Sequence, residues 1–135
     1  MNDCLFCKII KGQIPSYKVY EDDDTYVFMD IAKDVDGHML VIPKTHCVNI
    51  LDAPSDALHH VMDTVQKVSN HLVKDCGYDG VNTFNCNNEC ASQSVFHFHM
   101  HIVPRKNNDK LAGWPPAFEG AKDSIEATFE KVKMM

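Results

Sequence analysis

The sequence is poor in several features that would assign it to a specialised class of protein. Its 135 residues contain no apolar run of the roughly 20 residues that a membrane-spanning helix needs, and no repeat or linker divides them. Positive charge is scarce, because 13 Lys and Arg stand against 19 Asp and Glu. We therefore expect neither nucleic acid nor a membrane surface as a partner. The length also excludes a TIM barrel or a two-domain dehydrogenase.

Export signals are missing as well. Residues 1–4 lack the basic and apolar segments of a signal peptide, and the chain has no Asn-x-Ser/Thr sequon. These absences predict a cytoplasmic location, where reducing conditions keep thiols free. We therefore interpret the six cysteines as metal ligands or packing residues. Cys47 and Cys76 are expected to pack, whereas Cys86 and Cys90 are a weaker candidate metal pair.

What remains is typical of one globular domain over residues 1–135, with 44% hydrophobic and 24% charged residues. Alternating or apolar runs bounded by turn residues predict strands, and a period of 3.6 residues predicts helices. Short links between the strands favour an α+β fold, with a five-stranded antiparallel sheet, one long helix and one or two short helices. The predicted strands are 17–20, 25–29, 39–42, 81–85 and 95–103, and the predicted helical segments are 4–11, 54–76 and 121–133.

The helix predicted over 54–76 has the most regular pattern, with apolar residues at i, i+3, i+4 and i+7. Ser55 or Asp52 is expected to cap its start. Gly77 suits the left-handed residue that often follows a helix. The acidic cluster at 21–24 predicts a solvated hairpin turn between two strands.

Residues 96–103 read Phe-His-Phe-His-Met-His-Ile-Val. Because strand side chains alternate between faces, His97, His99 and His101 are expected on one face, with their apolar neighbours in the core. Such a row suits metal chelation, or nucleophilic catalysis by an imidazole nitrogen on phosphorus or a carbonyl carbon. A solvated polar face is the plain alternative. His38 is a fourth candidate, placed to hold the orientation of the rings.

These histidines lie in a segment that resembles the His-φ-His-φ-His-φ-φ signature of the histidine triad (HIT) superfamily, where φ is apolar. The resemblance covers residues 4 to about 105 and points to the Hint branch of nucleotide-binding phosphoramidases. It implies a HIT-like fold, with residues from about 106 to 135 as a C-terminal extension. The other matching blocks are residues 4–16, 28–31, 37–46 and 93–95.

The resemblance also implies roles for matching residues. His99 would be the nucleophile that takes the phosphoryl group of a purine nucleotide such as AMP or GMP, and water would then release the monophosphate. His101 would contact the phosphate oxygens, His38 would fix the rings, and Ser94 would assist the leaving group. Asp30 would accept both ribose hydroxyls, which suits the two oxygens of a carboxylate. The further implied nucleotide contacts are Ile31, Asn87 and Gln93.

Cys4-x-x-Cys7 is a second constellation. Its spacing fits a zinc half-site, a redox motif or two packing thiols, and no thioredoxin-like βαβ pattern surrounds it. Bacterial-type HIT proteins that this chain resembles complete a structural Zn²⁺ site with two histidines, here at the positions of His46 and His97. Such a closed Cys₂His₂ site would be structural, and His97 would then not be free for acid–base catalysis. The resemblance implies that catalysis itself requires no metal.

The resemblance implies a homodimer as well, with the sheet extended across a two-fold axis. Trp114-Pro115-Pro116 resembles the tail that reaches the partner's active site in eukaryotic Hint proteins. The chain departs from the family at Cys86, where Asn or Gln usually contacts the phosphates, and at Asn88 and Ser92, where glycines are common. The alternative functions are a nucleotide-binding scaffold with little turnover, a dinucleotide polyphosphate hydrolase, and a metallohydrolase with the three histidines as ligands.

Overall fold

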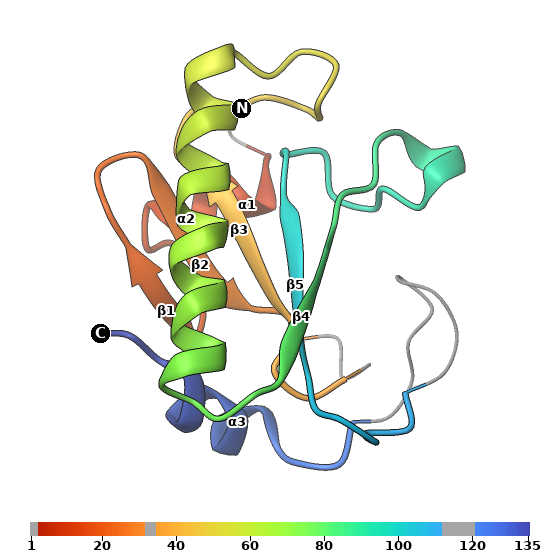
Figure 1. Cartoon of the computed structure of the whole chain (residues 1–135). Helices are drawn as coiled ribbons and strands as arrows, with labels where there is room; N and C mark the ends of the chain where they lie inside the picture. Colours follow the sequence, from red (N-terminus) through yellow and green to blue (C-terminus); the bar gives the residue numbers. More distant parts are fainter. Residues whose placement is uncertain (1–2, 32–34, 112–120) are drawn as a thin grey trace.

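The computed structural model of the protein describes residues 3–31, 35–111 and 121–135. The described strands form one five-stranded sheet in the order β1-β2-β3-β5-β4, and each neighbouring pair is antiparallel (Figure 1). This architecture confirms the predicted α+β fold. The elements in chain order are α1 (Leu5–Ile10), β1 (Lys18–Glu21), β2 (Thr25–Met29), β3 (Met39–Pro43), α2 (Ser55–Lys74), β4 (Gly80–Phe84), the 3-10 turn η1 (Glu89–Ala91), β5 (Met100–Arg105) and α3 (Ile125–Val132).

The sheet separates two apolar clusters. Val27 and Val41 belong to a cluster that packs against the apolar stripe of α2, as the helical periodicity predicts. Phe28 and Leu40, one residue along in β2 and β3, point to the opposite face and pack with Phe6 of α1. Figure 1 shows α2 across the near face of the sheet and α1 behind it. Each face therefore has its own helix.

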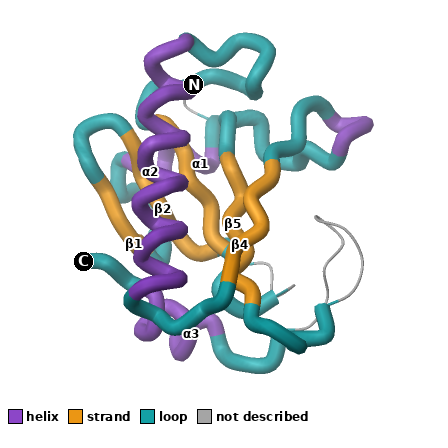
Figure 2. Tube along the Cα trace, in the orientation of Figure 1, coloured by secondary structure: helices purple, strands orange, loops and turns teal. Residues whose placement is uncertain are grey.

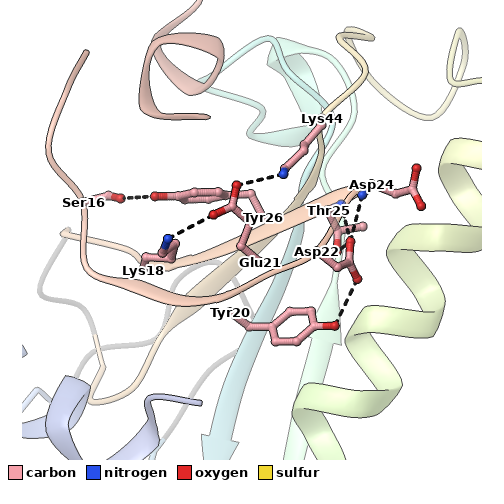
Figure 3. Close-up of polar contacts among 9 residues, drawn as sticks. All are labelled: Ser16, Lys18, Tyr20, Glu21, Asp22, Asp24, Thr25, Tyr26 and Lys44. Carbon is pink, nitrogen blue, oxygen red and sulfur yellow. Dashed lines mark hydrogen bonds and ion pairs between the residues drawn. The ribbon is translucent and has the colours of Figure 1, made fainter. Parts of the chain in front are cut away.

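Hydrogen bonds to an acidic side chain hold the hairpin turn between β1 and β2 in place (Figure 3). Asp22 Oδ1 accepts hydrogen bonds from the backbone N–H groups of Asp24 and Thr25 and from the Thr25 hydroxyl. Although burial opposes it, these bonds lower the pKa of the Asp22 carboxyl. Glu21 bridges Lys18 and Lys44 beside the turn, at 3.0 and 2.8 Å. The turn is thus better ordered than a solvated acidic loop.

Two local expectations were wrong. The predicted strand 95–103 begins only at Met100, because the N–H of Phe98 donates to the Cys47 carbonyl, and the Pro43 carbonyl on the neighbouring strand is taken by a side chain. The N-cap of α2 is Pro54, with no side-chain cap bond. Asp52 instead accepts N–H bonds within the preceding loop, from Val48 and Asn49.

The C-terminal segment packs under the end of the sheet, where α3 lies beside the last turn of α2 (Figure 2). His71 Nε2 donates to the Val132 carbonyl at 2.9 Å, and the Met134 N–H donates to the Val19 carbonyl at 3.0 Å. The segment Trp114-Pro115-Pro116 lies outside the described residues. Within the described ranges, no helix combines the length and apolarity needed to cross a membrane.

Candidate active site and metal centre

A cavity of about 550 Å³ opens on the face of the sheet that carries α1. Its walls are mostly apolar and come from α1, β2 and β3, and a few polar side chains converge in it. A largely apolar pocket with a small number of polar groups is the usual form of a small-molecule site. The polar side chains that line it are Ser16, Asp30, Ser94, His99 and His101.

His99 lies just before β5, is buried and lines this cavity, in edge-to-face contact with Phe6, with ring centroids 5.3 Å apart. Its Nδ1 lies 2.7 Å from the carbonyl oxygen of His97. Because a carbonyl only accepts, Nδ1 carries the proton and Nε2 keeps the lone pair. Burial lowers the pKa of His99. The ring is therefore a neutral imidazole with a free lone pair on Nε2.

His101, His38 and Asp30 form a chain of polar contacts beside it. His38 Nε2 lies 2.8 Å from His101 Nδ1, and His38 Nδ1 lies 3.7 Å from Asp30 Oδ2. The three residues can be viewed as a metal cluster, since one ligand atom of each lies within 4.8 Å of the others. His38, however, presents Nε2 to His101 and Nδ1 to Asp30. A single cation can bind only one of these two ring nitrogens. The arrangement is a relay of one hydrogen bond and one longer polar contact rather than a metal centre.

The other predicted nucleotide contacts divide into two groups. Ser94 and Ile31 line the cavity, with Ile31 largely exposed at its edge. Gln93 is buried and places its amide in the loop, donating to the Val48 carbonyl at 2.7 Å and accepting from Asn88. Neither Gln93 nor Asn87 is among the described residues that line the cavity.

The loop of residues 85–93 follows β4 and carries the departures from the family pattern. Asn88 and Ser92 have φ angles of 73° and 75°, the left-handed range that glycine favours. Burial raises the pKa of Cys86, so this thiol stays neutral. Asn87 Oδ1 accepts from the N–H of Ile50 at 2.8 Å, which joins this loop to the one before α2.

Sequence reasoning missed two residues that hold the histidines. Asn85 donates from Nδ2 to the His99 carbonyl at 2.8 Å. Phe84 stacks on His101, with ring centroids 4.3 Å apart and planes at 4°. Phe84 and His101 are partners in the β4–β5 register, so strand pairing is the signal that would have found the contact.

Four predicted metal ligands converge at the start of α1. Cys4 is the N-cap of the helix and Cys7 lies in its first turn. The Nδ1 atoms of His46 and His97 lie 3.2 Å apart, and the sulfur–nitrogen distances are 3.3 Å for Cys7–His46, 3.4 Å for Cys4–His97 and 3.5 Å for Cys7–His97. Zinc bond lengths give tetrahedral edges of about 3.4 Å between nitrogens and about 3.6 Å between nitrogen and sulfur. The donor set and its spacing therefore fit a closed zinc site.

The surroundings of this cluster suit a cation. His97 Nε2 donates to the Pro43 carbonyl at 2.8 Å, which fixes the tautomer that leaves Nδ1 as a ligand. Burial lowers the pKa of His97 to about 4, so the ring is neutral. Burial, with the neighbouring Cys4, raises the pKa of Cys7 to about 11, and a divalent cation supplies the charge that favours the thiolate. Among the described residues, Cys86 and Cys90 belong to no such cluster.

Comparison with known proteins agrees with this geometry. The HIT domain model matches residues 11–108. Protein hit of Bacillus subtilis (strain 168) is 47% identical over 103 residues, covering 76% of this chain and 71% of that protein. Adenosine 5'-monophosphoramidase HNT1 of Candida albicans is 38% identical over 136 residues, covering 96% and 89%. A crystal structure of a Zn-bound histidine triad family protein from Mycobacterium smegmatis has a TM-score of 0.86 at 32% identity, covering 98% of this chain and 91% of that one. The chain belongs to the HIT domain family, in its Hint-like branch.

Proposed function

We propose that this protein is a hydrolase of purine nucleoside phosphoramidates or related adenylyl compounds, acting through a covalent nucleotidyl-histidine on His99. The observation that carries the proposal is the bond from His99 Nδ1 to the His97 carbonyl, which leaves an unprotonated Nε2 on a neutral ring that lines the cavity. The likeness to an adenosine 5'-monophosphoramidase supports the substrate class.

In the first step the lone pair of His99 Nε2 attacks phosphorus. The new N–P bond forms as the bond from phosphorus to the leaving amine breaks, and the amine leaves with the bonding pair and a proton that the Ser94 hydroxyl passes to it from solvent. In the second step water attacks the same phosphorus, its proton passes through the Ser94 hydroxyl to solvent, and the bond to His99 breaks. The nucleoside monophosphate leaves, and the imidazole regains its lone pair.

The relay beside His99 stabilises charge on the phosphoryl oxygens. His38 lies between Asp30 and His101, and a proton on its Nε2 is donated to Nδ1 of His101. His101 is left with an N–H on Nε2, the donor that a phosphate oxygen needs. Asp30 accepts the ribose hydroxyls, and the base occupies the apolar part of the cavity, which Phe6 and Phe28 help to line.

Zn²⁺ bound by Cys4, Cys7, His46 and His97 would supply a structural cross-link and no reacting group. His97 is the residue that joins the two sites. Its Nδ1 belongs to the metal cluster, and its backbone carbonyl orients His99.

Hydrolysis of a fluorogenic adenosine phosphoramidate tests this proposal, with and without a strong chelator. We expect chelator-resistant turnover that falls by about three orders of magnitude or more in His99→Ala. His59→Ala, an exposed histidine on α2, is the matched control and should keep full activity. Intact-mass spectrometry of quenched wild type should reveal an added nucleotidyl group that His99→Ala lacks.

Two results would redirect the proposal. A wild type that binds AMP without turnover or adduct would indicate a nucleotide-binding scaffold, with Cys86 the first residue to restore to Asn. Turnover that ends when the metal is removed while the protein stays folded would indicate a metallohydrolase.

A further inference from the structure

The loop between β2 and β3 carries two residues of the proposed site at its base. Asp30 directly follows β2, and His38 directly precedes β3. The N–H of Asp30 donates to the His38 carbonyl at 2.9 Å, which closes the hairpin above its last strand pair. Any shift of this loop moves the ring of His38, and with it the contact to His101.

Residues outside the hairpin hold this loop from two sides. On one side Gly37 packs against the ring of Pro104 in β5, so closely that a Cβ on Gly37 would lie 2.6 Å from Pro104 Cγ. On the other side Asp36 Oδ1 accepts hydrogen bonds from the backbone N–H groups of Lys122 and Asp123, at 2.9 and 3.0 Å. Asp36 and Gly37 are thus fixed to β5 and to the chain that leads into α3.

The first turn of α3 and the segment before it pack closely against the back of the site. Ile125 and Thr128 line a crevice together with Asp30 and His38. The crevice has a volume of about 10 Å³, which is room for no more than one water molecule. The back of the relay is therefore a packed surface that residues of the C-terminal segment complete.

The C-terminal segment is itself anchored to the sheet and to α2. Val132 is fully buried, and the far end of α3 is held by the bond from His71 to the Val132 carbonyl. Tyr17 donates its hydroxyl proton to Glu126 at 2.6 Å near the start of the helix. Asp36, which accepts hydrogen bonds from this segment, is therefore joined to a well-anchored part of the fold.

We propose that Asp36 is a positioning residue of the active site: by accepting the N–H groups of Lys122 and Asp123, it fixes the loop that presents Asp30 and His38. The segment 121–134 then contributes to catalysis, although it lies beyond residues 11–108, which the HIT domain model matches. This inference rests on the proposed function for its kinetic readout and has a separate structural readout.

Four variants separate positioning from general stability. Asp36→Ala removes both accepted bonds, and Asp36→Asn keeps an oxygen that can accept them. Lys122→Pro removes one of the donors from the other side of the contact. His71→Ala is the matched control, because it loosens α3 at the end away from the loop. Each is measured for melting temperature, for kcat/KM on the adenosine phosphoramidate, for the AMP dissociation constant, and for ¹H–¹⁵N signals of the His38 and His101 imidazoles.

We expect Asp36→Ala and Lys122→Pro to lower kcat/KM by about 3- to 30-fold and to shift the His38 and His101 signals. This range corresponds to the loss of a side-chain oxygen that accepts backbone N–H groups ahead of a helix. Asp36→Asn should restore both readouts. His71→Ala should lower the melting temperature and leave kcat/KM and the imidazole signals unchanged. Wild-type kcat/KM and signals in folded Asp36→Ala or Lys122→Pro would overturn the inference.

The two proposals fail in different ways. If the wild type has no turnover, the proposed reaction fails, and the imidazole signals and the AMP dissociation constant still decide the role of Asp36. Signals and affinity that change in Asp36→Ala and recover in Asp36→Asn would support positioning. Signals and affinity that stay unchanged in Asp36→Ala would refute it.

Discussion

Replacing Gly37 with alanine tests how tightly the loop bearing His38 is held against β5. Gly37 has a φ of +83°, and an added Cβ would lie 2.6 Å from Cγ of Pro104. The left-handed conformation costs an L-residue about 1 kcal/mol, and forcing a methyl group against a ring in a packed site costs about 1–3 kcal/mol more. The total of about 2–4 kcal/mol corresponds to a fall in Tm of roughly 6–20 °C for a chain of this size.

Gly77→Ala is the matched control, because Gly77 has a nearly identical φ of +82° and nothing lies within 4 Å of its added Cβ. Alanine changes the unfolded-state entropy equally at both positions. The control should therefore lose only about 1 kcal/mol, or roughly 3–5 °C, and keep full turnover. Thermal unfolding followed by circular dichroism measures the difference. Equal losses of Tm at the two glycines would refute the tight contact with Pro104.

Three further predictions follow from individual contacts. Asp30→Ala should raise KM more than it lowers kcat, and equal KM values for ribose and 2′,3′-dideoxyribose substrates in the wild type would contradict a ribose contact. Cys7→Ser should lower the zinc content of the purified protein, measured by atomic emission, whereas the exposed Cys90 should tolerate the same change. Thr25 gives its hydroxyl proton to Asp22, so the buried Thr64 hydroxyl 2.8 Å away is the donor to Thr25. Denaturant unfolding should therefore show a loss of about 1–3 kcal/mol for Thr25→Val, and a smaller loss for Thr64→Val.

Features set by the local pattern could be predicted from the sequence. The strand expected at 25–29 matches β2, and α2 runs over Ser55–Lys74 within the helix expected at 54–76. Gly77 has the predicted left-handed backbone. The left-handed φ angles of Asn88 and Ser92 also agree with the family pattern, which has glycines at those positions. In each case the deciding interactions lie within a few residues along the chain.

Features set by contacts distant in the sequence could not be predicted. The start of β5 at Met100 depends on Pro43, whose carbonyl accepts from His97 instead of a ladder partner. The stacking of Phe84 on His101 needs the strand register. The bonds of Asp36 cross more than 80 residues of sequence, and no local pattern marks Asp36 as their acceptor.

The division of the sheet into two apolar faces has a consequence for how such a protein diversifies. The larger cluster, which includes Val27 and Val41, packs under α2, while the cavity opens on the opposite face. Changes to cavity-wall residues such as Leu5 and Ile14 leave the α2 side of the fold untouched. Mutations that alter ligand preference are therefore partly uncoupled from mutations that unfold the chain. A scaffold of this kind can drift among nucleotide substrates, one side chain at a time, without first acquiring a reserve of stability.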